Sequence, residues 1–143
     1  MYLLDTNTCV ALIRQVAGAE RILRRLTRHR VTEVAVAALT VAELDFGVKK
    51  SREPARNRAR LDQFLLPLQI LPFDDAAAAQ YGAVRADLER RGLGIGPIDT
   101  LLAAQALSLA AVMVTNNTAE FERVPGLIVE DWSRSEAKAG DSH

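Results

Sequence analysis

The sequence predicts an α/β domain in which helices cover both faces of a mainly parallel central sheet. Short apolar segments, typical of buried parallel strands, alternate along the chain with longer helical patterns. Such alternation is characteristic of three-layer α/β sandwiches. A length of 143 residues suits one domain, and 49% hydrophobic with 25% charged residues is the composition of an ordinary globular protein.

The expected strands are short, apolar and bounded by polar or turn residues. They are Tyr2–Asp5, Val34–Ala37, about Gln69–Leu71, Val112–Thr115 and Leu127–Val129. The expected helices show apolar residues at a helical period. They are Asn7–Arg14, Ala17–Arg28, Val41–Lys50, Pro54–Leu65, Asp74–Arg91 and Ile98–Leu109. Gly92 is expected to end the fifth helix. Residues 1–132 form the predicted domain, and Ser133 to His143, which lack a pattern, a predicted disordered tail.

Cysteine and histidine content limits the possible chemistry. Cys9 is the single cysteine, so an internal disulfide is excluded, and with only His29 and His143 beside it the chain cannot build a zinc site of cysteine and histidine. Any bound metal must therefore use oxygen ligands. The apolar run from Leu101 to Val114 is too short to cross a bilayer, and the N-terminus lacks the basic region of a secretory signal. We expect a cytoplasmic protein with no membrane association.

Charge is distributed unevenly although the formal net charge is zero. Residues 1–60 carry 12 Lys and Arg against 6 Asp and Glu, and residues 61–143 carry the reverse. The basic residues concentrate in two runs, Arg21–Arg30 and Lys49–Arg60. These runs could attract a polyanion such as nucleic acid. The alternative is that they form solvated helix faces.

Asp5 lies where the first strand is expected to pass into a helix. The active-site crevice of an open α/β sheet lies beyond the carboxyl ends of its strands, so Asp5 is a candidate catalytic residue. A helix cap is the alternative role, but Thr6 and Asn7 could also cap this helix, so we expect Asp5 not to be needed for that purpose.

Glu43 has two possible roles. Thr40-Val41-Ala42-Glu43 fits a capping box in which Thr40 is the N-cap and Glu43 bonds back to it. Glu43 also falls about one helical turn after the apolar segment that contains the second strand, close to the expected level of Asp5. The sequence leaves both roles open.

Asp99 begins an almost wholly apolar helix after a glycine-rich segment and Pro97. An acid in a first helical turn is favoured by the helix dipole, which is its structural alternative. Asn117 and Glu120 follow the strand expected at Val112–Thr115. They are further candidates, although asparagine is also common in turns.

Asp5, Glu43 and Asp99 together suggest a metal site, because clustered carboxylates repel one another unless a cation neutralises them. Oxygen ligands favour Mg²⁺, with Mn²⁺ as a substitute. Such sites are suited to phosphodiester hydrolysis, in which the ions activate water and stabilise the leaving oxygen.

Four segments in order resemble PIN-domain ribonucleases, and more closely the VapC toxins of VapBC toxin–antitoxin pairs. They are Leu3-Leu4-Asp5-Thr6-Asn7, Leu39-Thr40-Val41-Ala42-Glu43-Leu44, Ile95-Gly96-Pro97-Ile98-Asp99 and the stretch from Val114 to Leu127, with Glu130-Asp131-Trp132 after it. The resemblance implies a PIN-like sandwich and a Mg²⁺-dependent endoribonuclease whose metal ligands are Asp5, Glu43 and Asp99.

The resemblance also implies a fourth site position, where many relatives have aspartate. This sequence has Asn117 there, with Glu120 three residues later as a possible substitute. The resemblance further implies a homodimer that is inhibited by a VapB-like antitoxin and cuts a structured RNA. Close lookalikes in the family act on initiator tRNA.

Other functions remain open or are disfavoured. Receiver domains and haloacid-dehalogenase-type phosphatases need a lysine late in the fold, and after Lys50 the sequence has only Lys138. A catalytically weak PIN-like module that binds RNA or protein is the alternative function. A nuclease acting on DNA would use the same site chemistry.

Overall fold

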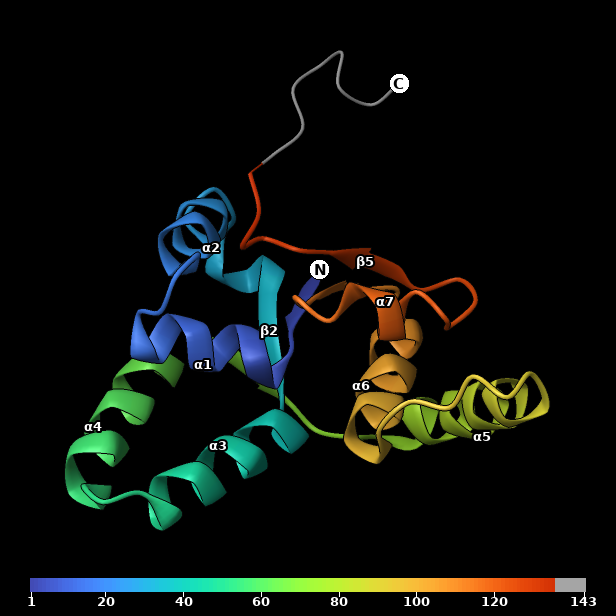
Figure 1. Cartoon of the computed structure of the whole chain (residues 1–143), viewed down its shortest axis with the longest axis horizontal. Helices are drawn as coiled ribbons and strands as arrows, with labels where there is room; N and C mark the ends of the chain where they lie inside the picture. Colours follow the sequence, from blue (N-terminus) through green and yellow to red (C-terminus); the bar gives the residue numbers. More distant parts are fainter. Residues whose placement is uncertain (136–143) are drawn as a thin grey trace.

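The structure of the protein is a computed structural model, and it describes residues 1–135 (Figure 1). The central sheet contains β1 (Tyr2–Leu4), β2 (Val34–Ala37), β3 (Gln69–Leu71), β4 (Val112–Val114) and β5 (Ile128–Glu130). The strands lie in the order β3-β2-β1-β4-β5, and every neighbouring pair is parallel. The predicted parallel sheet and all its strands are confirmed, within a residue or so at their ends.

The described residues form seven α-helices and one 3₁₀ turn, η1 (Val31–Glu33). The helices are α1 (Thr6–Arg14), α2 (Ala19–Leu26), α3 (Ala38–Lys50), α4 (Pro54–Leu65), α5 (Asp75–Arg90), α6 (Pro97–Ser108) and α7 (Thr118–Phe121). The six predicted helices are present, and α7 and η1 are additional. Gly92 follows α5 at φ +66°, and Leu93 N–H bonds back to the Leu88 carbonyl, which ends the helix as predicted.

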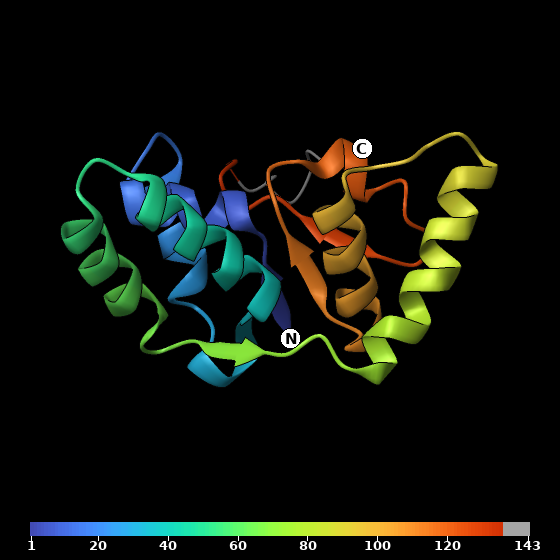
Figure 2. The same cartoon turned by 90° about the horizontal axis from the view of Figure 1, so that it is seen from below.

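The sheet buries both faces, and this explains why its strands are apolar without alternation. On one face Leu3 and Met113 pack with residues of α5 and α6, including Leu88 and Leu102. On the other face Leu4 packs with residues of α1 to α4 and with Trp132. The two helical layers on either side of the sheet are visible in Figure 2. The three-layer α/β sandwich predicted from the sequence is therefore confirmed.

The topology brings several helix starts to one edge of the sheet. From the central β1 the chain proceeds to β2 and β3 on one side, then crosses to β4 and β5 on the other. Helices α1 and α3 follow β1 and β2, so they start at the carboxyl ends of the strands. Helix α6 precedes β4 and runs antiparallel to it, so its N-terminus lies at the same edge. This edge, at the switch in strand order, is where α/β proteins place their ligands.

The predicted start of α3 is wrong. Strand β2 passes into the helix without a turn, and α3 begins at Ala38, after Ala37, which provides no side-chain cap. Thr40 lies inside the helix, where its buried hydroxyl has no hydrogen-bond partner among the described residues. The capping box from Thr40 to Glu43 is therefore absent, since Thr40 has helical rather than N-cap backbone. Glu43 is free of that structural role.

The C-terminal part of the described chain lies against α2. Trp132 is buried, and the Ser133 carbonyl accepts a hydrogen bond of 3.4 Å from Arg21. The remainder of the predicted tail, residues 136–143, lies outside the described residues. In residues 1–135 no helix has the length and apolar character needed to span a membrane.

Candidate active site

Asp5 joins the end of β1 to the start of α1 and is almost fully buried, with 3% of its surface exposed. Its Oδ1 accepts a hydrogen bond of 2.8 Å from Thr8 N–H, so Asp5 is the N-cap of α1. The expectation that Asp5 would not be needed as a cap is wrong, because Thr6 is already the first residue of the helix. The cap occupies one carboxylate oxygen, and Oδ2 faces the neighbouring strand.

Thr115 connects Asp5 to the segment after β4. Its hydroxyl donates to Asp5 Oδ2 at 2.5 Å and accepts from Asn117 N–H at 2.9 Å. Burial raises the pKa of Asp5 despite these hydrogen bonds, and Asp131 adds a smaller effect in the same direction. Asp5 is therefore a carboxylate held in a fixed orientation in a poorly solvated place.

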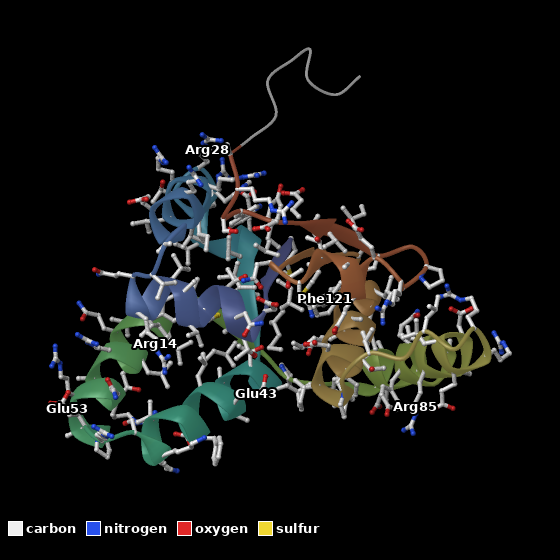
Figure 3. The ribbon with its side chains drawn as sticks, in the orientation of Figure 1. Arg14, Arg28, Glu43, Glu53, Arg85 and Phe121 are labelled. Carbon is white, nitrogen blue, oxygen red and sulfur yellow. The ribbon has the colours of Figure 1, made fainter. Side chains whose placement is uncertain are left out.

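Glu43 reaches the same edge from the second turn of α3. Its Oε1 accepts a hydrogen bond of 2.5 Å from the Thr6 hydroxyl, which bridges α3 and the first turn of α1. Figure 3 shows Glu43 near the start of α3, on the side of the sheet where the strands end. The side chain is thus held by Thr6 rather than by the predicted cap.

Asp99 lies in the first turn of α6 and is partly buried. Its pKa is raised to about 6, first by burial and then by the negative charges of Asp5, Glu120 and Glu43. Repulsion of this kind means that the fold brings Asp5, Glu43 and Glu120 within electrostatic reach of Asp99. None of the four is paired with an Arg or Lys in residues 1–135.

Asn117 and Glu120 act as a pair. Asn117 Nδ2 donates a hydrogen bond of 3.0 Å to Glu120 Oε2, and Asn117 is also the N-cap position of α7. The short helix α7 turns Glu120 toward Asp99, which is the arrangement the sequence left open. The described structure therefore brings together all five predicted site residues.

Thr6 and Thr115 also belong to the site, although neither was among the predicted site residues. Each hydroxyl donates to a site acid at 2.5 Å. Their positions in the sequence could have indicated this role. Thr6 directly follows Asp5 after the first strand, and Thr115 lies at the end of the predicted fourth strand, two residues before Asn117. Cys9 lies one helical turn after Asp5, where its N–H bonds to the Asp5 carbonyl. The residue is buried, and burial raises the pKa of its thiol, so the thiol is not a reactive group.

The donor set fits a hard divalent cation. Every candidate ligand is a carboxylate or amide oxygen, and the acids carry negative charge that nothing in the described chain neutralises. Across residues 1–135 no three such side chains are close enough to enclose one ion directly. Mg²⁺ usually keeps several waters and takes only one or two protein carboxylates together with substrate phosphate, so binding of Mg²⁺ does not require three direct protein ligands.

The two basic runs occupy different places. Arg60 lines a groove together with Glu43 and Arg14. Arg28, by contrast, lies far from Glu43, in the turn after α2 (Figure 3). In that region Arg25 pairs with Glu130 at 3.1 Å, and Arg21 bonds to the Ser133 carbonyl. Arg60 of the Lys49–Arg60 run thus borders the groove beside the candidate site, and the Arg21–Arg30 run lies away from it.

Comparison with known proteins agrees with this fold. The family model described as PIN domain matches residues 2–127. The tRNA(fMet)-specific endonuclease VapC of Salmonella typhimurium is 40% identical over 131 residues, which are 92% of this chain and 97% of that protein. Ribonuclease VapC2 of Rickettsia felis is 38% identical over 135 residues, 94% of this chain and 99% of that protein.

A solved structure shows the same relationship. The crystal structure of DNA bound VapBC from Salmonella typhimurium superposes with a TM-score of 0.86 at 40% identity, covering 92% of this chain and 97% of that chain. The family model and the superposition agree, so the chain belongs to the PIN-domain family. Within that family it is a VapC-type endoribonuclease.

Proposed function

We propose that the protein cleaves a structured RNA with Mg²⁺ bound among Asp5, Glu43 and Asp99, partly through the waters of the ion, and that Glu120 completes the acidic set. The observation that carries this assignment is that Asp5, Glu43 and Glu120 approach Asp99 from separate elements, close enough for their charges to raise its pKa further. Four carboxylates without a basic partner in the described chain are unfavourable unless a cation is bound.

The ion would neutralise the scissile phosphate and lower the pKa of an attacking water. The protein's own residues orient the reaction. Thr115 holds Asp5 and Thr6 holds Glu43, each at 2.5 Å, and Asn117 holds Glu120. Water attacks the phosphorus as the bond to the 3′ oxygen breaks, and the leaving oxygen takes up a proton.

We assign direct binding of the ion to Asp5 and Asp99, which lie at the starts of α1 and α6 at the same edge of the sheet. Asn117 is neutral and already donates through its amide nitrogen to Glu120. We therefore assign Asn117 a positioning role, with Glu120 as the group that replaces the missing fourth aspartate.

We further propose initiator tRNA as the substrate and a VapB-like antitoxin as the partner of a homodimeric toxin. Two of the relatives with 39% to 40% identity are named tRNA(fMet)-specific endonucleases, and solved relatives are VapBC complexes. A small antitoxin-like reading frame just upstream of this one would support the partner assignment.

The test is cleavage of transcribed initiator tRNA, with elongator methionine tRNA as the matched control. We expect cleavage of the initiator alone, with Mg²⁺ or Mn²⁺, and no cleavage in EDTA or by the Asp99→Asn variant. Cleavage that continues in EDTA would exclude the metal mechanism. Equal cutting of both tRNAs would exclude initiator specificity, and absence of cleavage by the folded parent would favour a binding module.

A further inference from the structure

A groove with a cavity volume of about 170 Å³ begins at the candidate active site and extends away from it between α1, α3 and α4. At its active-site end lie Thr6 and Glu43, the pair that shares a hydrogen bond. Its floor is apolar and includes Val10, Leu44 and Leu61. The groove is therefore continuous with the proposed catalytic centre but has a different chemical character.

Two arginines border this groove. Arg14 comes from the last turn of α1 and Arg60 from α4, and both side chains belong to exposed residues. Neither has an ion pair or hydrogen-bond partner in the part of the chain that the structure describes. Their neighbours on α4 differ, since Arg58 pairs with Asp45 and Arg56 with Glu53. Two unpaired cations beside an acidic site favour an anionic ligand.

Gly47 gives the groove its shape on the α3 side. It lies in the interior of α3, where glycine is less favourable than alanine by about 1 kcal/mol. A Cβ added there would meet no atom within 4 Å, so packing does not require the glycine. Its effect is to leave the groove wall open at this residue.

We propose that this groove binds the RNA nucleotide that flanks the scissile phosphate. Arg14 and Arg60 pair with its phosphate, and the apolar floor contacts its base and ribose. Charge complementarity selects this occupant, because a phosphodiester needs cations and a nucleoside offers an apolar face. The inference rests on the proposed ribonuclease function and assigns two positioning residues for its substrate.

The experiment compares Arg14→Gln and Arg60→Gln with Arg56→Gln, a control on α4 outside the groove lining. With initiator tRNA and Mg²⁺ we expect KM to rise about fivefold in each groove variant, as for loss of an exposed ion pair, and kcat to change less than twofold. The slope of log KM against log salt should fall by about 0.7 per arginine lost, the value for single strands. The control should match the parent.

Binding of fluorescent tRNA in EDTA supplies a readout that does not depend on cleavage. Weaker binding by Arg14→Gln and Arg60→Gln, with a smaller salt slope, would support the groove assignment even if the parent cleaves nothing, in which case the proposed function alone fails. Unchanged affinity and salt slope in both variants would overturn the assignment and point to a groove for a protein partner. Cleavage by the parent would in that case leave the proposed function intact.

A second pair of variants tests whether RNA binding needs the groove to be open at Gly47. Gly47→Leu should raise the melting temperature by improving helix propensity and should weaken RNA binding by filling the groove. Gly82→Leu is the matched control, because Gly82 lies inside α5 with nothing within 4 Å of an added Cβ and is outside the groove lining. Equal RNA affinity of the two variants would contradict the proposed nucleotide site.

Discussion

Replacing Asp99 by asparagine should make the metal-free protein more stable at pH 8 although it abolishes cleavage. The pKa of Asp99 is raised from 3.8 to about 6, so its charged form is disfavoured in the folded state. Because the folded pKa lies above the unfolded one, this destabilisation is complete above pH 6 and disappears as the pH falls below about 4.

The magnitude follows from this shift. About two pKa units correspond to about 3 kcal/mol at 1.36 kcal/mol per unit. Asp99 is partly exposed, and solvent screening reduces this to about 1–2 kcal/mol. Asparagine also loses the favourable interaction of a carboxylate with the first turn of α6, about 0.3–1 kcal/mol. The net gain is about 1 kcal/mol, or about 3 °C in melting temperature for a domain of this size.

Thermal and urea unfolding in EDTA at pH 8 and pH 4.5 measure the effect. Asp75→Asn is the control, because Asp75 is an exposed acid in the first turn of α5, away from the site. It should be slightly destabilising at pH 8. A loss of stability of Asp99→Asn at pH 8, or a difference from the parent that is the same at both pH values, would show that the Asp99 charge does not destabilise the metal-free fold.

Three further predictions concern the neighbours of Asp99. Glu43→Gln keeps an oxygen that can accept from Thr6, so urea unfolding should shift by under about 1 kcal/mol while cleavage falls by orders of magnitude; full activity would remove Glu43 from the site. Glu120→Gln should slow cleavage and require more Mg²⁺. Asn117→Asp should also slow cleavage, because it removes the donor to Glu120 Oε2 and sets a second carboxylate beside it; Mg²⁺ titrations identical to that of the parent would exclude both residues. Thr115→Val should cost about 1–3 kcal/mol in urea unfolding, because Asp5 Oδ2 and Asn117 N–H lose their shared partner; Thr115→Ser should restore most of it.

The sequence predicted the elements well, because buried parallel strands are short apolar runs and the helices have clear periods. The strand order could not be predicted from local pattern, since it depends on which faces pack. The predicted start of α3 was wrong because a local pattern does not determine how a strand joins a helix. Thr40 and Glu43 carry a local capping signal, but β2 continues directly into the helix, and the geometry of that junction overrides the signal.

In the site, too, the features that follow from local pattern could be predicted and those that depend on packing could not. Asp5, Glu43 and Asp99 were identifiable because each follows or begins an element at the same edge of the sheet. The bond from Thr6 to Glu43 was not, because it depends on how α1 packs against α3. The orientation of Glu120 also needed the structure, since α7 is only four residues long and its sequence resembles a turn.

Asp5 and Thr115, which share a hydrogen bond, are 110 residues apart in the sequence. The Asp5 amide is likewise bonded to the carbonyl of Val114, at the end of β4. On the ribosome, the first acid of the site is therefore made early but acquires its neighbours only when β4 and α7 emerge. A nascent or truncated chain that ends before them lacks the assembled acids, so nuclease activity should appear only near the end of synthesis.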